Sequence, residues 1–384
     1  MLNFQRRAWA EIDLDAIRHN FTEIKKTTSS KICCVIKADA YGHGAVAIAR
    51  IYEEMGADFF AVSNIDEALK LRENGITTPI LNLGYAPPSD VSVIEKEGIS
   101  QCVYSLDYAK ALSLECEKQS SKIKIHIKID TGMSRLGFFY QDPKRDFKAI
   151  EEIKKVCSLN CFEVEGIFTH FAESDEGQDD FTHKQLANFD KALTKLEDIN
   201  FKLIHTANSA ATMDFSNTHY DMVRAGIILY GLSPSEKIRK KLDLKPVLSL
   251  KSIISHIKTV DENSTVSYGR TYKASKKIRV ATIPIGYADG YTRVLADNNT
   301  DVLINGKRRR IIGRICMDQM MVLLHDDDKV KIGDVVVLIG KSQDEFISTE
   351  EIASKRNTIN YEVICDIAIR VPRITISDGK EVYN

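Results

Sequence analysis

Residues 32–44 read ICCVIKADAYGHG, and the stretch changes character at its middle. It begins as a short apolar run, which is typical of a strand buried on both faces. From Lys37 onward it becomes polar and contains two glycines. A buried strand that ends in a polar turn is the repeating unit of parallel α/β folds, whose functional side chains follow the strands.

The same unit recurs along the first 235 residues. Apolar runs that predict strands lie at residues 32–37, 59–63, 79–83, 101–105, 123–129, 164–169, 203–206 and 222–230. Between them, Ala45, Ile48 and Tyr52 recur at helix spacing. Eight strand-then-helix units predict an α/β barrel, a TIM-like (β/α)8 fold, whereas six or seven would give an open doubly wound sheet.

The pattern changes near Leu242. Strand-like runs with turn signals such as Asn305-Gly306 follow, and only residues 349–354 look helical. We therefore expect a barrel over residues 1–240 and a C-terminal, mostly β domain over residues 241–384. The first ten or so residues can pack with the second domain.

Composition narrows the function classes. The 384 residues carry 53 basic and 54 acidic side chains, for a net charge of -1. This balance argues against nucleic-acid binding and against a membrane-surface role. Residues 1–15 are polar, and no apolar run reaches the roughly 20 residues of a membrane-spanning helix. We expect a cytoplasmic protein.

The eight cysteines are scattered through the chain. They are Cys33, Cys34, Cys102, Cys116, Cys157, Cys161, Cys316 and Cys365. None forms a C-x-x-C pair, so we expect buried, reduced thiols rather than disulfides or a metal site.

Polar residues gather after the predicted strands. Lys37 closes an apolar strand, where a charged side chain is avoided unless it has a task. Desolvation would lower the pKa of Lys37 and make it a better nucleophile and base, which suits Schiff-base chemistry. Tyr41, Ser209 and the backbone at Gly226 and Ile227 could cradle a phosphate, because glycine allows close backbone approach.

Several motifs together resemble the alanine racemase family. They are VIKADAYGHG at residues 35–44, IDTGMSRLGF at 129–138, ANSA at 207–210, SYG at 267–269, IPIGYADG at 283–290 and CMDQ at 316–319. The resemblance covers essentially the whole chain in order and spacing. It implies an isomerase that interconverts L- and D-alanine with pyridoxal 5'-phosphate (PLP, fold-type III) and supplies D-alanine for peptidoglycan.

The resemblance also implies two catalytic bases. Lys37 would bind PLP and act on one face of the substrate α-carbon. Tyr268 would act on the opposite face and would come from the partner subunit. We therefore expect a head-to-tail homodimer with shared active sites.

Further roles follow from matched positions. The implied cofactor-binding residues are Lys37, Tyr41, Leu83, Arg135, His170, Asn208, Ser209, Arg224, Gly226, Ile227 and Tyr361. Arg224 would face the pyridine nitrogen, with His205 orienting it. A guanidinium only donates hydrogen bonds, so that nitrogen would stay unprotonated.

The substrate would be held by fewer groups. Arg135 and the backbone amide of Met317 would bind its carboxylate, and Tyr287, Asp318 and again Tyr361 would narrow the entrance. Lys128 occupies a position that is often carbamylated in the family. Ser134 stands where the family frequently has glycine, and Ala225 where it usually has proline.

Other functions remain open at this point. A serine or broad-specificity racemase would share every residue named above. A related decarboxylase would carry a cysteine at the position of Tyr268. A non-catalytic PLP-binding protein would lack the second domain, and no metal ligands are expected.

Overall fold

The computed structural model describes residues 6–382. The chain forms two compact units. The barrel unit comprises Ile17–Ala40 and Ala45–Lys245, and the β unit comprises the described residues up to Ala16, Tyr41–Gly44, and the described residues from Pro246. Within residues 6–382, no helix is long and apolar enough to cross a membrane.

Eight parallel strands form the sheet of the barrel unit, and the predicted barrel is confirmed. In sheet order they are β10 (Met222–Ala225), β2 (Lys31–Val35), β3 (Phe59–Val62), β4 (Ile80–Asn82), β5 (Ile99–Val103), β6 (Ile123–Asp130), β8 (Phe162–Phe168) and β9 (Leu203–His205). A short strand, β7 (Phe138–Phe139), pairs with β6. Backbone hydrogen bonds from Asp221 N to Ile204 O (3.0 Å) and from Arg224 N to Ala207 O (3.0 Å) link the two ends of this order into a ring.

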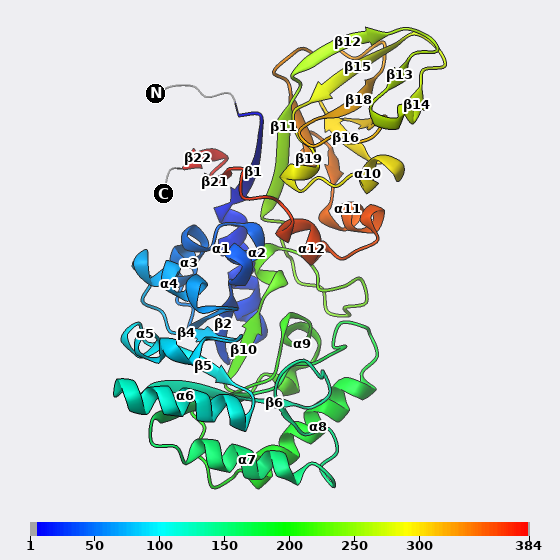
Figure 1. Ribbon diagram of the computed structural model, residues 1–384. Helices are drawn as coiled ribbons and strands as arrows, with labels where there is room; N and C mark the ends of the chain where they lie inside the picture. Colours follow the sequence, from blue (N-terminus) through cyan, green and yellow to red (C-terminus); the bar gives the residue numbers. More distant parts are fainter. Residues whose placement is uncertain (1–5, 383–384) are drawn as a thin grey trace. The chain divides into compact units, whose positions relative to one another are not determined.

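Helices surround these strands (Figure 1). They are α1 (Leu14–Thr27), α2 (Lys37–Gly42), α3 (Ala45–Glu54), α4 (Ile65–Glu73), α5 (Val91–Lys96), α6 (Leu106–Gln119), α7 (Phe147–Cys157), α8 (Asp180–Lys195) and α9 (Ser209–Asp214), with 3-10 turns η1 (Pro88–Asp90), η2 (Ser216–Thr218) and η3 (Ile227–Tyr230). Local caps fix their starts. Asn64 accepts the N–H of Glu67 (2.9 Å) before α4, and Ser105 accepts that of Tyr108 (3.2 Å) before α6.

Strand β6 shows how the barrel interior acquires polar groups. Its sequence, IKIHIKID, alternates apolar and polar residues. Successive side chains on a strand point to opposite faces. The isoleucines therefore share one face, and His126 and Lys128 share the other, where they contact His205 and the ring of Phe168.

Helix α2 is a left-handed turn. Ala38, Asp39, Ala40 and Tyr41 have φ values of 52°, 51°, 55° and 53°. Each such residue costs about 1–2 kcal/mol. The turn is held by its surroundings: the N–H of Ala38 donates to Glu67 Oε1 (2.6 Å), and Asp39 forms an ion pair with Lys70 (3.1 Å). This turn sets the backbone that follows Lys37.

The β unit contains the remaining strands and helices. They are β1 (Ala8–Asp13), β11 (Leu248–Ile253), β12 (His256–Val260), β13 (Thr265–Val266), β14 (Tyr272–Lys273), β15 (Ile278–Ile283), β16 (Asp301–Ile304), β17 (Lys307–Arg310), β18 (Met320–Leu324), β19 (Val335–Ser342), β20 (Glu345–Ile347), β21 (Arg373–Ser377) and β22 (Lys380–Val382), with η4 (Tyr268–Arg270), η5 (Tyr287–Asp289), α10 (Val294–Asp297), α11 (Thr349–Arg356) and α12 (Asn360–Cys365). The main sheet has the order β17-β16-β19-β11-β1-β21-β22, with β20 paired to β19. A second sheet has the order β12-β15-β18, and β13 pairs with β14.

Three details differ from the sequence predictions. The run at residues 222–230 is strand only to Ala225, and η3 follows because Gly226 turns the chain. Helices α10 and α12 were not predicted, because each is short and lacks a clear apolar period. The eight cysteines all lie within residues 6–382 and none forms a disulfide, but only Cys33, Cys34, Cys102 and Cys116 are buried.

Asp289, whose side chain is fully buried, ties together distant parts of the β unit. It accepts hydrogen bonds from Arg7 (2.6 Å), Arg370 (2.8 Å) and the N–H of Gly286 (2.9 Å). Burial alone would raise the pKa of Asp289, but these donors lower it. The ionised form is therefore the one that the fold stabilises.

We predict that Asp289→Asn lowers the free energy of unfolding by about 2–4 kcal/mol, because it removes the charge between two arginines. Asp327→Asn, at an exposed carboxylate paired with Lys307 (3.3 Å), should change it by less than about 0.5 kcal/mol. Urea denaturation of both variants measures the difference. Equal effects would contradict the assigned role of Asp289.

Candidate active site

Positively charged side chains gather where the barrel strands end. Lys37 begins α2, Lys128 lies near the end of β6, and Arg135 lies in the loop between β6 and β7. Burial, and then the charges of Arg224, Lys128, Arg135 and Lys37, hold the pKa of His170 well below its usual value. These predicted residues therefore all lie within electrostatic reach of His170.

Arg224 is the most deeply buried member of this group and is 3% exposed. One Nη atom donates to Nδ1 (2.9 Å) and O (3.0 Å) of His205, and the other donates to Thr169 O (2.8 Å) and Thr206 O (3.0 Å). The second Nη also lies 3.3 Å from His170 Nδ1. All four Nη hydrogens thus have acceptors, which leaves the Nε–H for a ligand.

Arg224 keeps its charge without a counter-ion nearby. Burial lowers its pKa to about 10, which still leaves the guanidinium protonated at neutral pH. Every acceptor named above is a carbonyl or an imidazole, and within residues 6–382 no carboxylate forms an ion pair with Arg224, Lys128 or Arg135. The strand ends therefore present an excess of positive charge, which suits an anionic ligand.

The amine of Lys128 has a lowered pKa. Burial, together with the charges of Arg135 and Arg224, lowers its pKa to about 8. Its Nζ lies 5.5 Å from the centre of the Phe168 ring, and the guanidinium of Arg224 lies 5.3 Å from the same ring. About a tenth of Lys128 is therefore an unprotonated nucleophile at pH 7.

The loop that carries Arg135 is shaped by Asp130. Its Oδ1 accepts the N–H groups of Gly132 (3.0 Å) and Ser134 (3.0 Å). Ser134 has a φ of 54°, in the left-handed region that favours glycine. This explains why glycine suits the position, and it shows that serine adopts the same conformation here. Arg135 itself is exposed.

Two of the predicted phosphate-binding positions are joined directly. The N–H of Gly226 donates to Ser209 Oγ (2.8 Å), which holds the start of α9 against the end of β10. Asn208 caps α9: its Oδ1 accepts the N–H of Ala211 (2.9 Å) and the hydroxyl of Ser174 (3.0 Å). Ile227 is buried at the start of η3. The structure thus gives Asn208 a capping role and leaves its cofactor role a prediction.

In the β unit, Tyr268 stands on a strained turn and is 68% exposed. Ser267 before it has φ 67° and ψ -177°, a conformation that is almost confined to glycine. Ser267 Oγ donates to Arg314 O (2.5 Å), and a Cβ at Gly313 would lie 2.8 Å from Ser267 Cβ. The turn is fixed by close packing, so the exposed tyrosine has a defined backbone position.

The predicted entrance residues share another part of the β unit. The N–H groups of Tyr287 and Ala288 donate to Cys316 O (3.1 Å) and Met317 O (3.1 Å). Gly286 permits this approach, because a Cβ there would lie 2.2 Å from Cys316 O. The loops that carry Tyr287, Met317 and Asp318 are therefore adjacent, and Arg370 donates to Asp318 Oδ1 (2.7 Å).

Tyr41 and Tyr361 also lie together in the β unit. Their ring centres are 6.1 Å apart. Tyr41 is buried, and this burial raises its pKa. Leu83 follows β4 and donates its N–H to Val62 O (2.9 Å), so it lies at a strand end as expected. Its contact with a cofactor stays a prediction.

His126 and Glu165 are not among the site residues predicted from the sequence. Both are buried in the barrel interior, and they hydrogen-bond to each other (3.0 Å) and to His205 through His126 (2.9 Å). Their only signal in the sequence is a polar residue within an otherwise apolar strand run, which is too common to identify a role.

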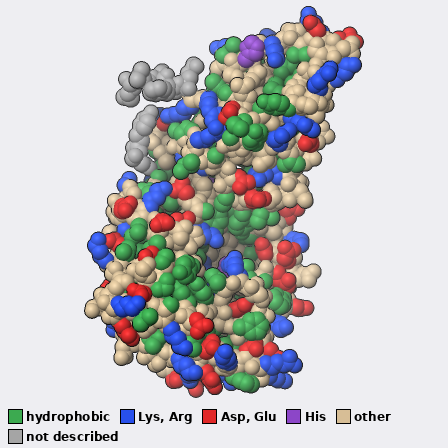
Figure 2. All heavy atoms as spheres, in the orientation of Figure 1, with side chains coloured by type: hydrophobic (Ala, Val, Ile, Leu, Met, Phe, Trp, Pro, Cys, Tyr) green, Lys and Arg blue, Asp and Glu red, His purple; other side chains and the backbone are tan. Residues whose placement is uncertain are grey.

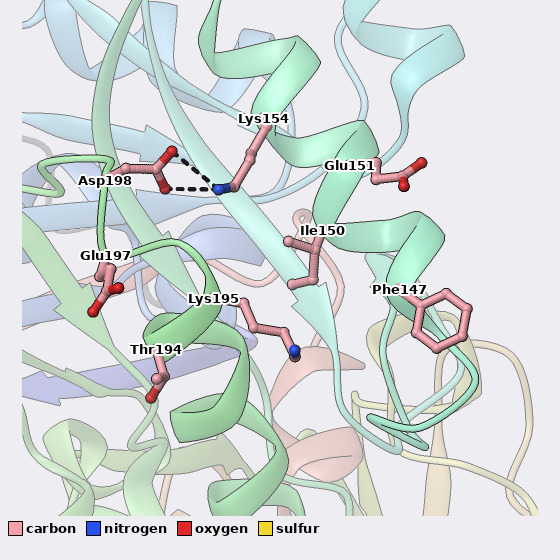
Figure 3. Close-up of a pocket in the computed structure, with 8 residues that line it drawn as sticks. All are labelled: Phe147, Ile150, Glu151, Lys154, Thr194, Lys195, Glu197 and Asp198. Carbon is pink, nitrogen blue, oxygen red and sulfur yellow. Dashed lines mark hydrogen bonds and ion pairs between the residues drawn. The ribbon is translucent and has the colours of Figure 1, made fainter.

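A hollow of about 590 Å³ lies elsewhere on the barrel unit (Figure 3). It is lined by α7, α8 and the segment after α8. Lys154 on α7 pairs with Asp198 after α8 (2.9 Å). It shares no residue with the predicted site. On the face seen in Figure 2, acidic and basic side chains are mixed over the barrel unit, which agrees with the near-zero net charge.

The chain is similar to known proteins over both units. Models of the N-terminal and C-terminal domains of alanine racemase match residues 12–234 and 247–375. The alanine racemase of Methanococcus maripaludis is 47% identical over 371 residues, covering 95% of this chain and 98% of that relative. A structure of alanine racemase from Clostridium difficile 630 has a TM-score of 0.93 and 43% identity, covering 98% of both chains. A structure of the Bacillus anthracis enzyme with bound L-Ala-P has a TM-score of 0.90 and 42% identity, covering 98% of this chain and 97% of that chain. The chain therefore belongs to the alanine racemase family of isomerases.

Proposed function

We propose that this chain interconverts L- and D-alanine with PLP as its cofactor and two residues, Lys37 and Tyr268, as its bases. The observation that carries the proposal is the excess of positive charge at the barrel strand ends, where no carboxylate among residues 6–382 forms an ion pair with Lys128, Arg135 or Arg224. PLP and an amino acid together bring a phosphate, a phenolate and a carboxylate. The donor set present therefore fits this group.

When bound, PLP supplies an electron sink for the α-carbon of an amino acid. Lys37 would hold it covalently, and His170 would pack on its ring face. Tyr41, Ser209, Gly226, Ile227 and Tyr361 would hold its phosphate, with Leu83 and Asn208 beside it.

Arg224 would direct its remaining Nε–H at the ring nitrogen. Because a guanidinium donates hydrogen bonds and does not release its proton, this nitrogen would stay unprotonated. A weaker electron sink favours return of the proton to the α-carbon over side reactions. The acceptors at His205, Thr169 and Thr206 support this role, because they fix the guanidinium plane.

Inversion of the α-carbon needs a proton to leave one face and another to arrive at the opposite face. Lys37 would serve one face and Tyr268 the other. The high exposure of Tyr268 on a fixed turn supports its use by a second subunit. Residues 1–240 would thus bind the cofactor, and residues 241–384 would supply the second base in a head-to-tail homodimer.

Arg135 and the Met317 amide would hold the substrate carboxylate, and Tyr287, Asp318 and Tyr361 would restrict the entrance to a small amino acid. We place the enzyme in the cytoplasm, because none of the eight cysteines, all within residues 6–382, forms a disulfide. Its product would be D-alanine for peptidoglycan.

Proton NMR in D2O tests the reaction. The PLP-loaded protein is incubated with L-alanine, L-serine and a bulkier amino acid, with product chirality assayed in parallel. We expect rapid loss of the α-proton signal and appearance of D-alanine, with little change for the other two. Faster turnover of serine would instead indicate a serine or broad-specificity racemase. Exchange without inversion would rule out two working bases.

Subunit mixing tests the shared site. Lys37→Ala and Tyr268→Phe homodimers should each be inactive or strongly impaired, because each lacks one base. A mixed dimer should regain one intact site out of two. Activity is measured after mixing, and heterodimers are verified by native mass spectrometry. Heterodimers without recovered activity would show that the two residues do not act across subunits.

We also propose carbamylation of Lys128. Its unprotonated amine can add to CO2, forming an N–C bond and releasing one proton. The product is an anion beside Arg135 and Arg224, which replaces a disfavoured buried cation. Incubation with ¹³C-bicarbonate should give a carbamate signal by ¹³C NMR that is lost in Lys128→Ala and kept in Lys122→Ala, an exposed control.

The pH dependence of this signal has a defined sign. With a pKa of about 8, Lys128 becomes more protonated as pH falls below 8, so the rate of carbamate formation should fall. A signal that survives in Lys128→Ala would assign the modification to another lysine.

A further inference from the structure

A continuous chain of hydrogen bonds runs from Arg224 through the barrel interior. Arg224 Nη1 lies 2.9 Å from His205 Nδ1, and His205 Nε2 lies 2.9 Å from His126 Nδ1. His126 Nε2 lies 3.0 Å from Glu165 Oε2, which also accepts the hydroxyl of Ser100 (2.5 Å). The two imidazoles and Ser100 are at most 2% exposed and are shielded from water, whereas the Glu165 side chain is 12% exposed.

The donors and acceptors in this series of hydrogen bonds determine which ring nitrogen of each histidine carries the proton. Arg224 can only donate, so His205 Nδ1 must accept and its proton must lie on Nε2. That proton is donated to His126 Nδ1, which places the His126 proton on Nε2. Glu165 then accepts it. The chain therefore runs in one direction, from a cation through two neutral imidazoles to an anion.

The strand geometry around Glu165 favours its hydrogen bond to His126. The pairing of β6 with β8 shifts between Ile125 and His126, because Val164 pairs with Ile125 and Gly166 pairs with His126. Glu165 is the extra residue of this bulge, and bulges commonly redirect a side chain. A Cβ at Gly166 would lie 2.5 Å from His126 Nδ1. Only glycine leaves room for the imidazole at this place.

The charges agree with the assigned protons. Burial and the charge of Arg224 hold the pKa of His205 well below its usual value, so this imidazole stays neutral. Burial also lowers the pKa of His126. Burial alone would raise the pKa of Glu165, but hydrogen bonds from His126 and Ser100 lower it to about 2. Lys124 lies 3.5 Å from the other carboxylate oxygen.

We propose that Glu165 is a positioning residue for the racemase reaction, which acts on Arg224 through His126 and His205. Its carboxylate fixes the proton on Nε2 of both imidazoles and is the remote counter-charge of the Arg224 guanidinium. This keeps His205 Nδ1 an acceptor and holds Arg224 in one orientation toward the ring nitrogen of the cofactor. The proposal rests on the proposed function for the role of Arg224.

Glu165→Gln tests the role of the carboxylate with little change in shape. The amide can donate as well as accept, so it removes the charge and permits the reverse proton order. In that order, the proton of His205 would lie on Nδ1 and face an N–H of Arg224. Two donors cannot form a hydrogen bond, so the contact between His205 and Arg224 would be lost. Glu163→Gln is the matched control, because Glu163 lies on the same strand and pairs with Lys202 (2.8 Å) outside this chain.

The PLP-loaded wild type and both variants are compared by visible absorbance of the bound cofactor, by its pH titration and by kcat and KM for L-alanine. In Glu165→Gln we expect a shifted absorbance titration and a kcat about tenfold lower at similar KM. Glu163→Gln should match the wild type. An absorbance titration of Glu165→Gln that matches the wild type, with or without lower activity, would overturn the proposal.

Neutron diffraction from wild-type crystals exchanged in D2O provides a second measurement that does not depend on a variant folding. We expect deuterium on Nε2 of both His126 and His205 and none on Nδ1. Deuterium on Nδ1 of either would overturn the proposal. This measurement needs no turnover. It therefore tests the proton positions on His126 and His205 even if the wild-type protein does not bind PLP or racemise alanine.

Discussion

The buried positive charge of Arg224 is the constraint on which the barrel unit depends. A guanidinium removed from water must satisfy its donors within the protein, since an unpaired buried group costs several kcal/mol. Arg224 does so with carbonyl groups at Thr169, His205 and Thr206, which follow or end β8 and β9, while Arg224 itself lies on β10. One side chain therefore joins the strands at the place where the ring closes.

The choice of neutral acceptors for Arg224 affects the pKa values of other groups at the strand ends. Carbonyls and imidazoles stabilise the guanidinium without neutralising it, so its field acts on Lys128 and His170 and lowers the pKa of both, in addition to the effect of their burial. A carboxylate directly beside Arg224 would have cancelled that field. Glu165 is connected to Arg224 by hydrogen bonds through two imidazoles. The positive charge at the site and the remote negative charge are thus parts of one arrangement.

Backbone strain occurs next to both proposed bases. Four left-handed residues follow Lys37, and Ser267, directly before Tyr268, has a conformation that favours glycine. Such conformations persist only where surrounding contacts outweigh their cost. Glu67 and Lys70 hold the first segment, and Arg314 and Gly313 hold the second. In each unit, a catalytic candidate is therefore attached to a backbone with little freedom.

The sequence by itself determined the eight strands of the barrel and the mostly β second domain, and it supplied the site residues that remain predictions. Periodicity and local motifs carry this information, because strands buried on two faces and helix caps each have a sequence pattern that is only a few residues long. Only the tertiary structure decided the left-handed form of α2, the acceptors of Arg224 and the chain from His205 to Glu165. These depend on contacts between residues such as Ser100 and Glu165, 65 positions apart. No local pattern encodes such contacts, since a polar residue in a buried strand becomes informative only when its partner is known.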